Sequence, residues 1–202
     1  MPVTMTSNRS SCCGSVIVLC LAAMLSGCAT PLRKDLLVVA ANPSGSRFPG
    51  ALVKAMCVRN VSGAEKEESS RTAISDPGFR DALAASLDAN GLKAMPESCK
   101  YPVDVSVLGV AQPFMAWTMT ITTHMNYKVY DSSGNAILLE TVSAPFTATT
   151  DDSSHGATRF RLAYEGSIRE SISRFLDKLR SMSLQQLAAL AATPPAAAPP
   201  PR

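Results

Sequence analysis

Aromatic side chains and an excess of one charge are both scarce in this sequence. Of its 202 residues, 5% are aromatic, with a single tryptophan, and 19 basic side chains are nearly balanced by 16 acidic ones. A protein that binds nucleic acid is expected to carry a basic patch, and none stands out here. We therefore predict no nucleic-acid partner.

Motifs that indicate a particular chemistry are missing as well. There is no glycine-rich phosphate loop, no His-Glu-x-x-His pair and no Gly-x-Ser-x-Gly nucleophile turn. His124 lies among threonines and could act as a general base, but we favour a solvated strand histidine. His155 ends the run Asp-Asp-Ser-Ser-His, which could bind a cation, although an ordinary polar turn has the same composition. The sequence predicts no cofactor and no metal site.

The N-terminal segment has the features of an export signal. Residues 1–27 carry one charged side chain, Arg9, and an apolar run follows it over residues 16–25. This run is far shorter than the roughly 20 residues that span a bilayer. A basic start, a short apolar core and a small-residue exit are typical of a cleaved secretory signal. The exit reads Leu25-Ser-Gly-Cys28, which resembles the lipobox of bacterial lipoproteins.

This resemblance implies a lipid anchor on Cys28. In the lipoprotein family the signal, here residues 1–27, is removed and acyl chains such as palmitate are attached to the cysteine. Each buried methylene contributes roughly 0.8 kcal/mol, so two or three chains give a firm membrane anchor. Ala29 stands where an aspartate tends to retain lipoproteins in the inner membrane. The resemblance therefore implies sorting to the outer membrane, facing the periplasm.

The six cysteines divide into two groups. Four are assigned to the signal or to the lipid site: Cys12, Cys13, Cys20 and Cys28. Cys57 and Cys99 remain in the mature chain, in an oxidising compartment that favours disulfides. We predict that they are bridged, with two buried free thiols as the alternative. A bridge of this length stabilises the fold by up to roughly 4 kcal/mol in the chain-entropy model.

Composition divides the mature chain into three parts. Residues 28–50 are polar and broken by proline and glycine, which predicts a flexible tether. Residues 51–184 contain the periodic apolar patterns of a single domain. Residues 185–202 are rich in alanine and proline and predict a disordered tail.

Six elements are predicted inside the domain. They are strands over 51–59, 101–112, 117–130 and 136–149, and helices over about 75–90 and 157–182. Strands joined by turns pair antiparallel, and the two helices would cover one face. The fold class is therefore α+β, an antiparallel sheet of about four strands with two helices packed on one face, in the order β-α-β-β-β-α. In the second helix, Glu165 with Arg169 and Glu170 with Arg174 predict two surface pairs.

The strand over 117–130 has the clearest alternation. Trp117, Met119 and Ile121 begin one face, which we place on the core. The other face and the neighbouring strand supply a hydroxyl-rich candidate binding face: Thr118, Thr120, Thr122, His124, Thr147 and Thr149. Such a face could dock a partner chain or a glycan. The alternative is an ordinary exposed strand face, where threonine fits well.

Three stretches, 53–63, 101–130 and 140–174, are similar to small, uncharacterised Gram-negative lipoproteins. The second includes Tyr127-Lys-Val-Tyr-Asp131 and the third includes Thr-Val-Ser-Ala-Pro-Phe-Thr. The layout is also loosely similar to outer-membrane lipoproteins of the YajG and LPS-assembly type. That second resemblance implies helices on one face of a sheet and carries no residue-level function.

We expect a membrane-anchored lipoprotein on the periplasmic face of the outer membrane. Its domain is expected to be a binding or structural module of the cell envelope rather than an enzyme, with an envelope protein or an envelope glycan or lipid as its partner. One alternative is a hydrolase or transferase acting on envelope material, with His124 or His155 as base. Another is an accessory subunit of an envelope transport complex.

Overall fold

The structure is a computed structural model that describes residues 33–41, 47–64, 74–112 and 117–182. The chain divides into two units, Met1–Thr30 and Pro31–Arg202, and all described residues belong to the second. The predicted signal over 1–27, the lipid site Cys28 and the predicted tail over 185–202 lie outside the described residues. Within the described part, no helix has the length and apolar character needed to cross a bilayer.

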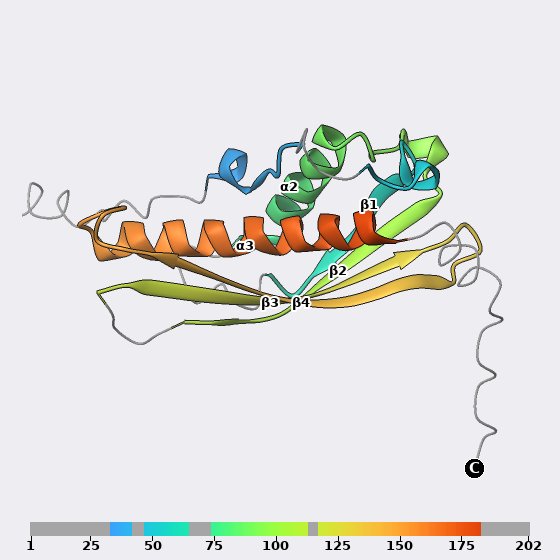
Figure 1. Ribbon diagram of the computed structural model, residues 1–202. Helices are drawn as coiled ribbons and strands as arrows, with labels where there is room; N and C mark the ends of the chain where they lie inside the picture. Colours follow the sequence, from blue (N-terminus) through green and yellow to red (C-terminus); the bar gives the residue numbers. More distant parts are fainter. Residues whose placement is uncertain (1–32, 42–46, 65–73, 113–116, 183–202) are drawn as a thin grey trace, which may run out of the picture. The chain divides into compact units, whose positions relative to one another are not determined.

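The described residues of the domain form four strands, two α-helices and three short 3₁₀ turns (Figure 1). Their bounds are η1 Lys34–Leu37, η2 Gly50–Leu52, β1 Met56–Ser62, α2 Asp76–Ala89, η4 Pro96–Ser98, β2 Tyr101–Ala111, β3 Met119–Tyr130, β4 Ala136–Ala148 and α3 Gly156–Ser181. The predicted α+β class and the order of strands and helices are confirmed. The first strand begins at Met56 rather than at residue 51, because a 3₁₀ turn precedes it.

The four strands form one sheet in the order β1-β2-β3-β4. The β2–β3 and β3–β4 pairs are antiparallel, as expected for strands joined by turns. The β1–β2 pair is parallel, which differs from the all-antiparallel sheet predicted from the sequence. The physical reason is that α2 lies between these strands in the chain and returns it to the same end of the sheet before β2 begins.

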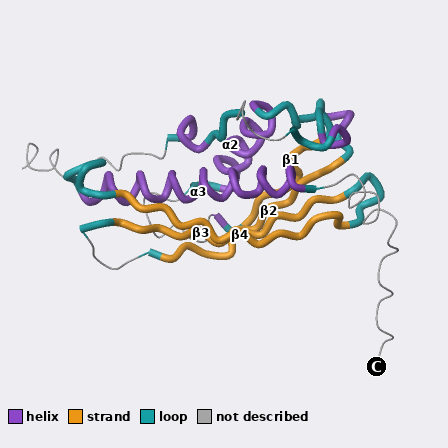
Figure 2. Tube along the Cα trace, viewed as in Figure 1, coloured by secondary structure: helices purple, strands orange, loops and turns teal. Residues whose placement is uncertain are grey.

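Both helices lie on the same face of the sheet. The helix α3 contacts β3 and β4, while α2 contacts β1. Figure 2 shows this helical layer on one side of the strands, with no described helix on the other.

The helix α2 begins and ends where its sequence predicts. The Ser75 side chain accepts a hydrogen bond from the Gly78 N–H at 3.2 Å, and Gly91 ends the helix with a φ of 70°.

The core lies between the helices and the covered face of the sheet. In β3 the buried and less buried positions alternate along the strand, as its sequence predicts. The Tyr127 and Phe175 rings stack at the centre of this layer, with centroids 4.4 Å apart. Trp117 is an exception to the predicted pattern. It precedes the strand and its side chain is 85% exposed, so its assignment to the core is wrong.

Part of the predicted tether is packed against the domain. Leu37 is fully buried and belongs to the hydrophobic core. The Val39 N–H donates to the Ser86 hydroxyl at 3.0 Å, and the Asn90 amide donates to the Val39 carbonyl at 3.0 Å. The prediction of a flexible tether over 28–50 is therefore wrong for residues 34–41. The surrounding residues are polar, but burial of the Leu37 side chain beside α2 and α3 stabilises the packed position of this segment.

Candidate binding surface

The outer face of β3 and β4 is the candidate surface. We use the term outer face for the central outward side chains of these two strands, which are Thr120, Thr122, His124, Asn126, Thr141, Ser143, Pro145 and Thr147. The outward pair Lys128 and Leu139 follows them toward the β3–β4 turn. The paired register places Thr120 opposite Thr147, and His124 opposite Ser143. None of the outer-face side chains is charged at neutral pH when the histidine is neutral. The outer face is therefore a flat array of hydroxyl, amide and imidazole groups.

Hydrogen bonds run across the two strands on this face. The Thr120 and Thr147 hydroxyls lie 2.8 Å apart, and His124 Nδ1 lies 2.9 Å from the Ser143 hydroxyl. One pair further along, the Asn126 amide donates to the Thr141 hydroxyl at 3.0 Å. These three cross-strand hydrogen bonds restrict the rotamers of the side chains that form them. The array is thus ordered before any partner binds, which lowers the entropic cost of binding.

The structure brings together most of the residues predicted for the binding face. Thr120, Thr122, His124 and Thr147 share the outer face. Two predicted members do not take part in the cross-strand ladder. Thr118 precedes β3. Thr149 follows β4, and both its N–H and its hydroxyl donate to the Asp152 carboxylate, at 2.7 and 3.0 Å. These bonds lower the pKa of Asp152.

A charged cluster lies further across the sheet, on β1, β2 and the end of β3. The Arg59 guanidinium donates two hydrogen bonds to the Asp104 carboxylate, at 2.8 and 2.6 Å. It also lies 4.2 Å from the centroid of the Tyr130 ring. The hydrogen bond from Arg59 is the largest cause that lowers the pKa of Asp104. The sequence contained no signal for this cluster, because it depends on the parallel pairing of β1 with β2.

The predicted disulfide between Cys57 and Cys99 is present. It joins β1 to the residues just before β2, with Cα atoms 5.7 Å apart and a sequence separation of 42. A closed loop of this size stabilises the fold by about 4 kcal/mol in the chain-entropy model. The bridge fixes the parallel edge of the sheet beside the Arg59 cluster.

Buried hydroxyls attach α3 to the covered face of β3. The Ser167 hydroxyl donates to the Ala144 carbonyl at 2.7 Å and accepts from the Thr123 N–H at 2.9 Å. One turn later, the Ser171 hydroxyl lies 2.9 Å from the Tyr127 hydroxyl. Burial raises the pKa of Tyr127. These serines were not singled out in the sequence, because a helical stripe is usually identified from its apolar residues alone.

Two predicted helix-surface pairs have different outcomes. Glu170 and Arg174 form the predicted pair at 2.8 Å. Glu165 is 3% exposed and does not form the predicted surface pair; it accepts from the Arg33 N–H at 2.8 Å and from Arg161 at 3.2 Å. The packed N-terminal segment covers Glu165, which a helix-surface argument cannot foresee. Glu165 therefore holds the backbone of the N-terminal segment at Arg33.

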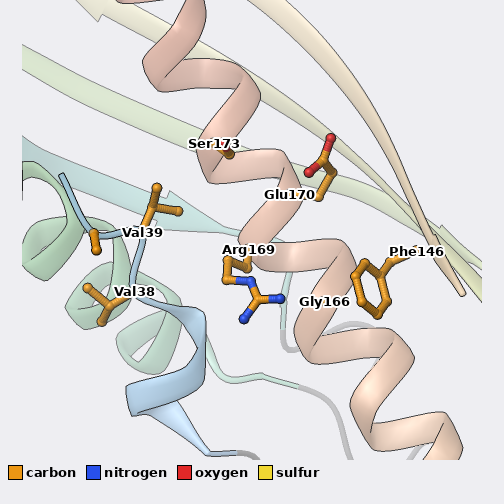
Figure 3. A pocket seen from close by; sticks show the side chains of 8 residues that line it. Val38, Val39, Phe146, Gly166, Arg169, Glu170 and Ser173 are labelled. Atoms are coloured by element: carbon orange, nitrogen blue, oxygen red, sulfur yellow. The ribbon is translucent and has the colours of Figure 1, made fainter. Parts of the chain in front are cut away.

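A shallow pocket lies where this N-terminal segment runs along α3 (Figure 3). Its volume is about 360 Å³, and it is lined by Val38, Val39, Ala40, Phe146, Gly166, Arg169, Glu170 and Ser173. Figure 3 shows the Arg169 side chain extending from α3 toward Val38. Gly166 allows close packing here, because a Cβ at this position would overlap the Phe146 ring. The pocket contains neither histidine.

The two histidines lie in separate places. His124 is on the outer face, bonded to Ser143. His155 is exposed at the start of α3, on the helical side, where its Nδ1 lies 3.2 Å from the Ser154 hydroxyl. Among the described residues, no three His, Cys, Asp or Glu side chains gather as a metal site would require.

Comparison with known proteins gives a likeness of fold. No protein-family model matches the sequence, and a search of curated proteins finds no match. A Xanthomonas campestris protein of family DUF330 aligns with a TM-score of 0.56 and 11% identity, over 81% of this chain and 98% of that one. At that identity the likeness shows a shared fold alone.

Two further structures are more distant. A Chlamydia trachomatis protein has a TM-score of 0.43 and 12% identity, over 62% of this chain and 96% of that one. A Neisseria meningitidis lipoprotein has a TM-score of 0.36 and 9% identity, over 63% of this chain and 99% of that one.

Proposed function

We propose that this protein is a lipoprotein of the bacterial cell envelope, anchored through Cys28 at the periplasmic face of the outer membrane, whose domain binds a partner rather than catalysing a reaction. The proposed partner is another envelope protein, held on the outer face of β3 and β4. The observation that carries this proposal is the asymmetry of the sheet: the described helices cover one face and leave an ordered, polar face open.

The anchor is supported by the sequence at the end of the signal. Leu25-Ser-Gly-Cys28 has the branched apolar residue, the small residues and the cysteine of a lipobox. The disulfide between Cys57 and Cys99 fits an oxidising compartment. Replacing Cys28→Ala is expected to leave an unprocessed precursor that gel mobility distinguishes from the mature chain. Normal maturation of that variant would contradict the anchor.

A protein partner suits the chemistry of the outer face. Its hydroxyl and amide groups are already paired across the strands, and they retain acceptor and donor capacity toward a second chain. The hydroxyl and amide array itself associates by shape and neutral hydrogen bonds, and Lys128 is the single charged side chain among the outward positions of β3 up to the turn. The interaction should therefore depend only weakly on salt. An anionic glycan, by contrast, would call for a cluster of basic side chains, and the described outward positions of β3 and β4 carry one, Lys128.

Crosslinking in intact envelopes tests the partner. Thr122→Arg places a charged, bulky side chain within the array, between the Thr120–Thr147 and His124–Ser143 pairs. Ser132→Arg places the same side chain in the exposed β3–β4 turn as a matched control. We expect the wild type and Ser132→Arg to capture one specific protein and Thr122→Arg to lose it. Capture of that protein by all three chains at equal yield would place its binding site elsewhere and contradict the proposal.

A hydrolase remains the second candidate because of one contact. His124 Nδ1 lies 2.9 Å from the Ser143 hydroxyl, which is the pairing that a serine nucleophile and its base require. Labelling by a fluorophosphonate probe, lost in Ser143→Ala, would favour this candidate over the binding module. We expect no labelling, because the pair lies on a flat face without the enclosing pocket typical of enzyme sites.

A further inference from the structure

Trp117 is an exposed aromatic residue at one end of the domain. It is the single tryptophan of the chain and its side chain is 85% exposed. It lies two residues before β3, whose first residue, Met119, pairs with Ala148 at the end of β4. The chain then enters α3 after a short loop, at Gly156. Trp117 therefore lies at the end of the sheet where β3 starts and β4 ends. Figure 1 shows that α3 begins at this same end.

The described N-terminal segment, residues 33–41, begins against the half of α3 that lies nearer this end. Its first described residue, Arg33, is bonded to Glu165 in the first half of α3. The segment then passes Arg169 and Ser173, where Val38 and Ala40 line the shared pocket. It thus runs in the same direction as α3, from the N-terminal half of that helix toward its C-terminal half.

The connection to the proposed lipid site is short. Cys28 precedes Arg33 by five residues, which span at most about 18 Å when fully extended. The strand β3 alone has 12 residues and is roughly 40 Å long. Because Arg33 is fixed against a buried carboxylate, the anchor cannot hold the opposite end of the sheet near the lipid without lifting Arg33 beyond that reach.

We infer that the end of the domain carrying Trp117 rests on the membrane surface, with the indole ring in the headgroup region of the lipids; this orientation rests on the proposed anchor at Cys28. A tryptophan suits this position because its ring is apolar and its N–H can bond to headgroups or water. The exposed Asp151 and Asp152 lie on the loop at this end. These carboxylates would be repelled by anionic lipid, so a zwitterionic lipid is the suitable probe.

This orientation has a consequence for the outer face. With the β3 start against the membrane, the strands rise from the lipid and the outer face stands upright in the periplasm. The array around His124 is then open to a protein that approaches along the membrane surface. The far end of the domain, where Met95 is 74% exposed, points away from the lipid.

Tryptophan fluorescence tests the orientation in the lipidated, full mature chain. The protein is reconstituted in phosphatidylcholine vesicles with and without lipids brominated near the headgroup. A matched control carries Trp117→Phe with Met95→Trp, because Met95 is exposed and precedes η4 and β2, at the opposite end of the sheet. We expect roughly twofold quenching of the wild type, since interfacial tryptophans lie at headgroup level, and no quenching of the control.

Flotation of the same vesicles separates this inference from the anchor on which it rests. Wild-type protein that floats with the vesicles but is not quenched would overturn the orientation and leave the anchor intact. Equal quenching of the wild type and the control would also overturn it, because both ends would then reach the lipid. Processed protein that does not float would overturn the anchor and the orientation together.

Discussion

The two faces of β3 use the same kinds of side chain for different purposes. On the covered face, the Thr123 N–H and hydroxyl meet Ser167 of α3 within a fully buried layer. On the outer face, the Thr120 hydroxyl meets Thr147 in contact with solvent. The bonds on the covered face are costly to break, because the buried donor and acceptor would then have neither each other nor water as a partner. The outer bonds can exchange with water or with a partner at little cost.

This difference separates the two roles of the sheet: the covered face stabilises the fold, and the outer face is the proposed binding surface. The covered face contains the Tyr127–Phe175 stack, the serine contacts and the aliphatic core. The outer face contributes order without much stability. A substitution on the outer face should therefore change binding and leave the fold intact. Each of the following predictions compares one covered position with one outer position.

The largest effect is expected at the centre of the covered face. Phe175→Ala removes a fully buried ring stacked on Tyr127, and should lower the free energy of unfolding by about 3–5 kcal/mol. The outward control is Leu139→Ala, where the side chain is 62% exposed, and the expected loss is within about 0.5 kcal/mol. Chemical denaturation with the disulfide intact measures both. Similar losses at the two positions would break the comparison.

A smaller effect is expected for two serines. Ser167→Ala leaves the Thr123 N–H and the Ala144 carbonyl without their bonds to the Ser167 hydroxyl, in a dry layer. The expected loss is about 1–3 kcal/mol. Ser143→Ala removes the exposed hydroxyl beside His124 and should change stability by less than about 0.5 kcal/mol. Hydrogen exchange at the Thr123 amide would show the same contrast locally, with faster exchange in Ser167→Ala alone.

The smallest effect concerns pH and the Arg59–Asp104 pair. The pKa of the Asp104 carboxyl is lowered in the folded protein, chiefly by its hydrogen bond from Arg59. The pair therefore contributes stability above the unfolded pKa of 3.8, and this contribution is lost as the pH falls below it. Because both side chains are partly exposed, the contribution should stay below about 1 kcal/mol.

Denaturation of the wild type and Asp104→Asn from pH 7 to pH 3 tests this pair. The wild type should be slightly more stable at pH 7, and the difference should shrink as the carboxyl is protonated. If the difference in the free energy of unfolding between the wild type and Asp104→Asn is constant across this range, the charge of Asp104 does not contribute to stability. Tyr127→Phe is the covered counterpart, because its phenol stays neutral across the range, and its stability difference from the wild type should not depend on pH.

Local patterns predicted several features correctly. The alternation in β3 follows from the period of two in a strand, and the ends of α2 follow from Ser75 and Gly91. The Cys57–Cys99 bridge followed from assigning the other four cysteines to the signal and the lipid site. The hydroxyl array around Thr120 and Thr147 was predicted because both its alternation and its hairpin pairing are local.

Other features depended on contacts that local patterns do not encode. A period of two is the same in parallel and antiparallel strands, so the pairing of β1 with β2 and the Arg59–Asp104 contact could not be predicted. Leu37 and Glu165 were misassigned because each is buried by a segment distant in the chain. Trp117 was assigned to the core because the alternation was extended to residue 117, two residues before the strand begins at Met119.

The sequence by itself determined the anchor hypothesis, the element order and the chemistry of the outer face, because these depend on neighbouring residues and on repeat periods. The tertiary structure alone decided which way β1 and β2 run, which serines hold α3, and where the N-terminal segment meets the domain. These features arise when surfaces far apart in the chain exclude water together. For Trp117, the outcome is an exposed ring just before β3, at the end of the sheet where β4 ends.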